Sequence, residues 1–264
     1  MLSPGADGAP VVLALHGQPG EGAHFDTLAG LLRPAGFTVL APDRPGWGRS
    51  RHEAPRGFAA NADAAARVLD DAGAERAVVL GYSWGGGVAL ALARLHPERV
   101  AGLVLVASVG PGAPSAADRL LAAPLLGPSL CAAALAAAHH SFRRSRFRAA
   151  MGRGLEDLAE ADALAIADAS RGHQARRSFL VEQRALIREL PGLLTGLGAV
   201  TVPACVVAGQ GDRLLPPAMA RRLAEAIPGA GLRIVPGAGH LLPATRPGVV
   251  AEAVADVAAR AGYR

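Results

Sequence analysis

The residues from Gly81 to Gly85 read G-x-S-x-G, with Ser83 at the centre. They lie between a strand-like apolar run, Ala77–Leu80, and a helical pattern, Trp84–Leu95. A sharp turn from strand to helix exposes the central serine and brings neighbouring chain close, so side chains on the flanking residues would clash. Free N–H groups at the start of the following helix favour negative charge there. The pattern therefore predicts a nucleophilic serine.

A serine hydroxyl is a weak nucleophile at neutral pH, so it needs a general base held by a third group. His240 follows the apolar run Leu232–Val235, and Asp212 follows the run Val202–Ala208. The carboxyl ends of parallel strands meet at one edge of a sheet, where ligands gather. We therefore expect Ser83 to be the nucleophile, His240 its base and Asp212 the residue that orients the base.

The negative charge that develops on an attacked carbonyl oxygen needs backbone N–H donors. One donor is expected from Trp84, directly after the nucleophile. The other is expected from Gln18, in the loop His16-Gly17-Gln18-Pro19-Gly20 that follows the first apolar run. Gly17 is expected to allow an unusual backbone conformation there. For His16, a structural role in this loop is favoured over that of a second base.

Short apolar runs alternate with helical patterns along the chain, which is typical of βα units and a parallel sheet. The predicted fold class is α/β, with a mostly parallel, doubly wound sheet. The predicted strands are Val11–Leu15, Phe37–Ala41, Ala77–Leu80, Val100–Ala107, Val202–Ala208 and Leu232–Val235. Helices are predicted at Phe25–Leu32, Ala59–Ala72, Trp84–Leu95 and Val249–Ala259.

The alternation of strand-like and helical patterns stops between Gly110 and Ala199, where Ala-rich and Arg-rich helical patterns replace the β-branched runs. We interpret residues 111–199 as a helical cap inserted over the carboxyl edge of the sheet. Residues 1–110 and 200–264 would then form the core. Helices are predicted in the cap at Ala132–His139, Leu155–Ala169 and Arg176–Leu190.

The apolar stretch Leu120–Ala138 is nearly long enough to cross a bilayer. Pro124, Gly127 and Pro128 interrupt it, so we expect two short helices over a pocket and no stable membrane span. The N-terminus lacks the basic start and apolar segment of a signal peptide. A cytoplasmic location is expected.

The formal net charge is +5, and all 27 cationic residues are arginine. This composition is typical of a GC-rich genome. The densest basic stretch, Arg143–Arg153, has no zinc-finger, helix-turn-helix or aromatic RNA-binding pattern beside it, so no nucleic-acid partner is expected. Cys131 and Cys205 lack metal-ligand spacing and fit a reduced compartment. His139 and His140 are adjacent and diverge by about 100° on a helix, so no metal site is expected.

Taken together, the motifs resemble the α/β-hydrolase superfamily. The loop at His16–Gly20 resembles its oxyanion loop, and Asp43–Ser50 looks like its D-x-x-G-x-G-x-S loop. Ser83, Asp212 and His240 follow in the family's order. The resemblance implies a hydrolase of this fold with a helical cap and no cofactor. Serine at position 83 argues against the dehalogenase and epoxide hydrolase branches, which use aspartate.

One departure from the family concerns the first strands. Family members usually begin with an antiparallel strand pair, but residues 1–10 are short and contain Pro4, Gly5, Gly8 and Pro10. We expect these edge strands to be missing or shortened. Phe37–Ala41 would then lie at or beside an exposed sheet edge, which favours dimerisation or aggregation.

The expected reaction is hydrolysis of an ester of a small or medium, largely apolar carboxylic acid through an acyl-enzyme. Carbon–carbon bond hydrolysis of a keto acid, with cap arginines binding its carboxylate, is an alternative on the same three residues. Lactone opening and aminopeptidase activity are others. From a different class, the chain could be a non-catalytic ligand receptor. The expected partner is a small molecule, and the chain is expected to be a monomer or homodimer.

Overall fold

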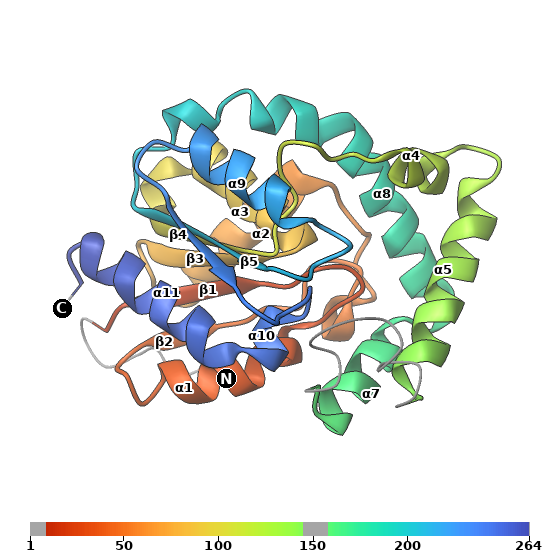
Figure 1. Cartoon of the computed structure of the whole chain (residues 1–264), viewed down its shortest axis with the longest axis horizontal. Helices are drawn as coiled ribbons and strands as arrows, with labels where there is room; N and C mark the ends of the chain where they lie inside the picture. The colour runs from red at the N-terminus through yellow and green to blue at the C-terminus, as the bar shows by residue number, and fades with distance from the viewer. Residues whose placement is uncertain (1–8, 145–157, 264) are drawn as a thin grey trace.

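A six-stranded sheet forms the centre of the molecule in the computed structural model, which describes residues 9–144 and 158–263 (Figure 1). The strand order is β2-β1-β3-β4-β5-β6, and every pair of neighbouring strands is parallel. The predicted mostly parallel α/β fold is therefore confirmed. The strands are β1 (Val11–Leu15), β2 (Thr38–Leu40), β3 (Ala77–Tyr82), β4 (Val100–Val106), β5 (Ala204–Gly209) and β6 (Gly231–Val235).

The three central strands are apolar along their whole length because both faces of the sheet are covered. Every residue of β3, β4 and β5 is buried. Such continuous Val- and Leu-rich runs are typical of parallel strands between two helical layers. They fix the carboxyl ends of these strands in a dry, rigid position.

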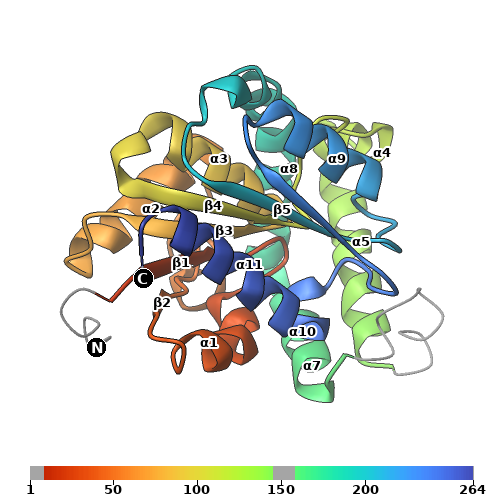
Figure 2. The same ribbon diagram turned by 60° about the vertical axis from the view of Figure 1, so that its left-hand side comes forward.

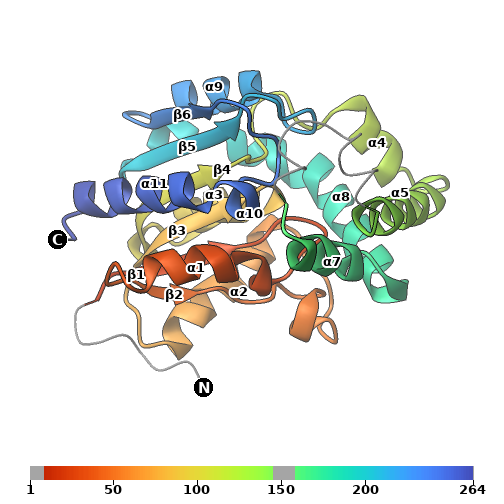
Figure 3. The same cartoon turned by 60° about the horizontal axis from the view of Figure 1, so that its bottom comes forward.

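Helices cover both faces of the sheet (Figures 2 and 3). One face packs against α1 (Asp26–Leu32), α10 (Leu242–Thr245) and α11 (Pro247–Arg260). The other face packs against α2 (Phe58–Asp71), α3 (Trp84–Leu95) and α9 (Pro217–Ala226). Short 3₁₀ segments in the described part of the chain are η1 (Gly22–Phe25), η2 (Gly48–Ser50), η3 (Pro97–Arg99) and η4 (Leu197–Ala199).

Among the described residues, four more helices lie between β4 and β5 in the chain. They are α4 (Ala116–Ala122), α5 (Gly127–Phe142), α7 (Glu160–Ala169) and α8 (Gly172–Leu194). Helices α4, α5, α7 and the first part of α8 lie beyond the carboxyl ends of the strands, at the right of Figure 1. The apolar stretch at 120–138 is divided between α4 and α5, which bend by 114° at the break. Within the described residues, no single helix is long and apolar enough to cross a membrane.

Several helices differ from the sequence prediction. Helix α8 continues through Pro191 to Leu194, whereas a stop at Leu190 was expected. A proline removes only one intrahelical hydrogen bond, and Pro191 lies on the exposed side of the helix. Helix α9 was not predicted, although Met219, Ala220 and Leu223 give it one buried apolar face. The helix expected at 155–169 begins at Glu160, and residues 145–157 lie outside the described residues.

The second half of α8 packs into the main core. Ala185, Leu186 and Leu190 belong to the same apolar cluster as α2 and α3. A division between cap and core at residues 111 and 199 stays a prediction, since this helix contributes to both.

Strand β2 lies at one edge of the sheet. A hollow of about 1210 Å³ runs beside it, lined by Thr38 and Leu40 of β2 and by residues of α2 such as Ala65 and Val68. No antiparallel strand pair is found within residues 9–144 and 158–263. This arrangement agrees with the edge position expected for Phe37–Ala41.

Candidate active site

Ser83 occupies the turn between β3 and α3 in a backbone conformation that side-chain-bearing residues rarely adopt, with φ 55° and ψ −120°. The two glycines of the motif leave no room for a side chain. A Cβ atom on Gly81 would lie 2.6 Å from the Cα atom of Gly86, and one on Gly85 would lie 2.1 Å from the carbonyl oxygen of Leu15. The motif therefore packs tightly enough to hold the strained serine in place.

Ser83, His240 and Asp212 form a chain of hydrogen bonds. The Nε2 atom of His240 lies 3.0 Å from Ser83 Oγ, and its Nδ1 atom lies 2.8 Å from Asp212 Oδ2. Both contacts are satisfied when Nδ1–H donates to the carboxylate and Nε2 accepts from the hydroxyl. The structure thus brings together the three residues that the sequence analysis selected, in an order suited to proton removal from the serine.

Asp212 is held rigidly by its own loop. Its Oδ1 atom accepts hydrogen bonds from the backbone N–H groups of Leu214 and Leu215, both at 2.9 Å. The loops after β5 and β6 also lie close together, as shown by Gly209, where an added Cβ atom would lie 2.2 Å from the carbonyl oxygen of Gly239. This close approach places the carboxylate beside His240.

Of the two expected oxyanion donors, Trp84 directly follows Ser83, and Gln18 lies in the loop whose Gly17 approaches Ser83 closely. Among the described residues, no hydrogen bond uses the backbone N–H of Gln18 or of Trp84. Gly17 was expected to adopt an unusual backbone conformation, but it does not have a positive φ. A Cβ atom there would lie 2.9 Å from Ser83 Cβ, so a glycine is required by the close approach of the loop to the nucleophile.

His16 is fully buried and both of its ring nitrogens are engaged. Its Nε2 atom accepts from the backbone N–H of Arg44 at 3.0 Å, and its Nδ1 atom contacts the carbonyl oxygen of Gly17 at 2.8 Å. Burial lowers the pKa of His16 well below its usual value, and the nearby Arg44 charge lowers it further. These contacts support the structural role favoured for this residue.

A pocket of about 510 Å³ opens above Ser83 and His240. Its floor includes Gln18 and Tyr82, and the Tyr82 ring lies 5.4 Å from the His240 ring. Charged side chains among the described lining residues are Asp162 and Arg213. The remaining surface is mostly apolar, with the helices beyond the sheet contributing Ala134, Leu135, Ala138, Phe142, Ile166 and Phe179.

His24 also lines this pocket and was not selected from the sequence. Burial lowers the pKa of His24 to about 4, and the Asp43 carboxylate and a backbone hydrogen bond at Ala165 oppose the shift only in part. The side chain is therefore neutral near pH 7. Nothing in the sequence marks His24, because it follows the His16–Gly20 loop but lies outside the motif of that loop.

Comparison with known families and proteins agrees with this geometry. The family described as "alpha/beta hydrolase fold" matches residues 10–247. The chain belongs to the α/β-hydrolase family.

Relatives of this α/β hydrolase include enzymes with different named substrates. It is 31% identical to a 2-hydroxy-6-oxononadienedioate/2-hydroxy-6-oxononatrienedioate hydrolase from Cupriavidus pinatubonensis, over 88% of this chain and 81% of the relative. It is 32% identical to a 2-hydroxymuconate semialdehyde hydrolase from Pseudomonas putida, over 89% of this chain and 81% of the relative. A thermophilic esterase from Thermogutta terrifontis superposes with a TM-score of 0.71 at 25% identity, covering 96% of this chain and 90% of the esterase.

Proposed function

We propose that this α/β hydrolase is a serine esterase that cleaves esters of small or medium, largely apolar carboxylic acids. The observation that carries the proposal is the hydrogen-bonded chain Ser83–His240–Asp212 at the floor of a mostly apolar pocket of about 510 Å³. A pocket of this size suits a small ligand that buries most of its surface.

The reaction follows from the positions of these groups. His240 Nε2 takes the proton of Ser83 as Oγ attacks the ester carbonyl carbon, and Asp212 stabilises the imidazolium that forms. The N–H groups of Gln18 and Trp84 bind the oxyanion. When the tetrahedral intermediate collapses, His240 gives the proton to the departing alkoxide and the acyl group stays on Ser83.

The second half of the reaction repeats these roles with water. His240 removes a proton from a water molecule, whose oxygen attacks the acyl carbonyl. The second tetrahedral intermediate releases the carboxylic acid and returns the proton to Ser83 Oγ. Of the groups used, Ser83, His240 and Gln18 line the pocket, Asp212 contacts His240 from behind, and Trp84 directly follows Ser83.

Carbon–carbon bond hydrolysis of a keto acid is the second candidate, and the names of the two relatives described above favour it. Such substrates carry carboxylates, which arginine binds well. The described arginine at the pocket is Arg213, which is exposed and follows Asp212 in the core, not in the cap. Lactone opening and aminopeptidase activity use the same three residues.

A panel of p-nitrophenyl esters, lactones, aminoacyl anilides and vinylogous keto acids tests the proposal. We expect turnover of short and medium p-nitrophenyl esters, with the best kcat/KM for uncharged acyl groups. Turnover confined to keto acids would replace the esterase assignment by the carbon–carbon hydrolase. Binding without turnover of any substrate would favour a ligand receptor.

A further inference from the structure

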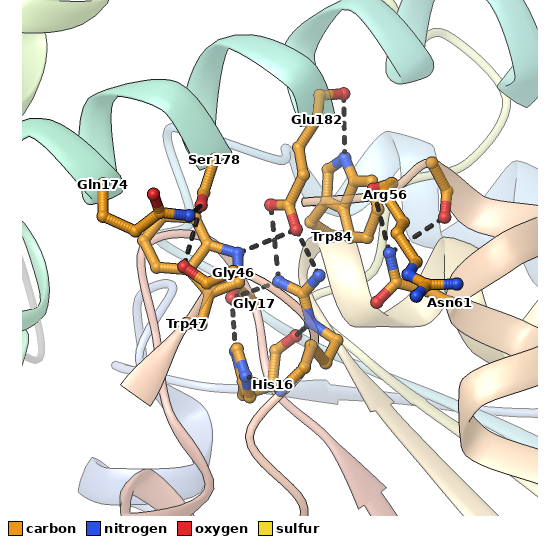
Figure 4. A network of polar contacts seen from close by, with 12 residues as sticks. His16, Gly17, Gly46, Trp47, Arg56, Asn61, Trp84, Gln174, Ser178 and Glu182 are labelled. Carbon is orange, nitrogen blue, oxygen red and sulfur yellow. Dashed lines mark hydrogen bonds and ion pairs between the residues drawn. The ribbon is translucent and has the colours of Figure 1, made fainter. Parts of the chain in front are cut away.

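Arg44 is a buried arginine, 2% exposed, whose side chain contacts the loop carrying the first oxyanion donor. Figure 4 shows His16 and Gly17 of this loop, with Trp84 and Glu182 nearby. Its Nε atom donates to the carbonyl oxygen of His16 and one of its terminal nitrogens donates to the carbonyl oxygen of Gly17, both at 2.9 Å. Its guanidinium also stacks over the Trp84 ring, 4.5 Å from the ring centre. One side chain therefore contacts both segments that supply oxyanion donors.

The counter-charge for Arg44 comes from helix α8. Glu182 is fully buried, and its carboxylate forms an ion pair with Arg44 and accepts from Trp47 Nε1 at 2.8 Å. The backbone carbonyl of Glu182 accepts from Trp84 Nε1 at 3.3 Å. Burial raises the pKa of the Glu182 carboxyl, and the Arg44 charge opposes that shift.

Stability alone is a weak reason for such a pair. Removing two charges from water costs about as much as their attraction returns, so apolar replacements of buried ion pairs are often neutral or better. The planar fork of arginine, however, fixes the direction of each acceptor that it binds. The two acceptors here are consecutive backbone carbonyls next to Gln18.

The contact with Gly17 bears directly on the oxyanion donor. The carbonyl of Gly17 and the N–H of Gln18 belong to one peptide group, which is trans. In a planar trans peptide the two bonds point in opposite directions, so a donor that fixes the carbonyl also fixes the N–H. A positive donor on the carbonyl further polarises the peptide and strengthens its N–H as a donor.

We propose that Arg44 and Glu182 are positioning residues that orient and polarise the Gly17–Gln18 peptide for oxyanion binding, so that helix α8 supports the chemical step. This role rests on the serine-hydrolase function proposed above. It adds to that function a residue of the inserted segment that acts through the oxyanion loop and does not touch the substrate.

The test compares two isosteric changes on the same helix. Glu182→Gln removes the charge that holds Arg44 but keeps an oxygen for Trp47. Glu189→Gln is the matched control, because Glu189 also ties α8 to the core, through the backbone N–H of Ala59 at 3.2 Å. Loss of one oxyanion donor costs about 10²–10³ in kcat. For a misdirected donor we expect Glu182→Gln to lower kcat for a p-nitrophenyl ester about 10- to 100-fold, with KM within about threefold.

Arg44→Lys and Trp47→Phe extend the comparison. Arg44 binds its three acceptors through three separate nitrogens, whereas a lysine presents a single nitrogen, so Arg44→Lys should lose at least as much kcat as Glu182→Gln. Trp47→Phe removes only one donor to Glu182 and should cost less. Circular dichroism and thermal melts identify variants that are not folded at the assay temperature. If Glu182→Gln and Arg44→Lys are not folded, the kinetics of Trp47→Phe test the proposal.

A trifluoromethyl ketone, which adds to the serine and places an oxyanion in the hole, supplies a readout that packing defects do not reproduce. Its inhibition constant should rise in Glu182→Gln by about the factor lost in kcat/KM, while binding of the product acid stays within about threefold. Equal losses in folded Glu182→Gln and Glu189→Gln, or a loss confined to KM, would reject the positioning role alone. A wild-type chain that turns over no substrate and is not labelled at Ser83 would reject the hydrolase proposal and this role together.

Discussion

His240 Nε2 lies 3.0 Å from Ser83 Oγ, although 157 positions separate the two residues in the chain. The contact joins the turn after β3 to the loop after β6, at opposite sides of β4 and β5 in the sheet order. A short contact between such distant segments requires both loops to be held by their strands. The first two predictions follow from it.

Ser83→Ala should abolish ester hydrolysis while leaving the fold intact, because it removes only the nucleophilic oxygen. Losses of this kind reach about 10⁴ to 10⁶ in kcat. A fluorophosphonate should label the wild-type chain at Ser83 and nowhere else, as peptide mass mapping will show. A folded variant that keeps a tenth of wild-type activity would contradict the assignment of the nucleophile.

Asp212→Asn should lower kcat by as much as about 10⁴. Because Oδ1 accepts two backbone N–H groups, the amide oxygen should keep that side and the amide nitrogen should face His240. The imidazole would then carry its proton on Nε2 and could not accept one from Ser83. Asp70→Asn, at an exposed ion pair with Arg99, is the control. Near-neutral kinetics for Asp212→Asn would indicate another carboxylate partner.

His24 should make the fold sensitive to acid. Its pKa is lowered to about 4 in the folded chain from 6.5, so the unfolded chain binds the extra proton between these values. Above about pH 6.5 the protonation of His24 leaves the free energy of unfolding unchanged. As pH falls from about 6.5 toward about 4, the free energy of unfolding decreases by up to about 1.4 kcal/mol per pH unit.

Urea unfolding of the wild type and of His24→Asn at several pH values measures this effect. The variant should have a shallower decline in unfolding free energy over that range, and His52→Asn at an exposed site should follow the wild type. His16 should account for part of the slope that remains, because its pKa is lowered in the same direction. Parallel curves for wild type and His24→Asn would refute the prediction.

Two glycine-to-alanine changes should have opposite effects on stability. Gly85→Ala should prevent folding or displace the oxyanion loop, since its Cβ atom would lie 2.1 Å from the carbonyl oxygen of Leu15. Gly30→Ala, inside α1 with no atom within 4 Å of the new Cβ, should stabilise the chain by about 0.5–1 kcal/mol. Soluble expression and thermal melts distinguish the two, and a stable, active Gly85→Ala would contradict the close packing of the turn.

The edge at β2 should make the chain associate at high concentration. Thr38 lines the hollow beside the edge, so Thr38→Lys should weaken strand pairing without entering the core. Val39 is 5% exposed and packs in the cluster with α1 and α11, so Val39→Lys should unfold the chain. Light scattering from wild type and Thr38→Lys measures the difference. A wild-type monomer that stays soluble at high concentration would contradict association through the exposed edge of β2.

Much of the fold could be predicted from local patterns. Strands β3 and β4 are continuous apolar runs, and Pro97 marks the end of α3 as expected. Ser83, Asp212 and His240 could be selected because each follows such a run, and parallel topology gathers strand ends at one edge. These features depend on short windows of sequence and on a rule that holds for the whole fold class.

The network around Arg44 could not be predicted in the same way. Glu182 lies in the segment Val181-Glu182-Gln183-Arg184, which is indistinguishable in sequence from a solvated helix face. Its burial depends on a contact with Arg44, 138 positions away. The extension of α8 through Pro191 was missed for a related reason, because packing of Ala185, Leu186 and Leu190 on the core outweighs the local preference of proline.

The ion pair between Arg44 and Glu182 also limits how this chain can be recombined with others. A chimera that receives the helices between β4 and β5 from a different hydrolase would bury the Arg44 guanidinium without a carboxylate, unless the donor sequence carries an acid at the position of Glu182. An unpaired buried charge of this kind costs about 3–5 kcal/mol, a large share of the stability of an ordinary domain. Successful exchanges should therefore transfer the residue at position 44 and the residue at position 182 as a unit.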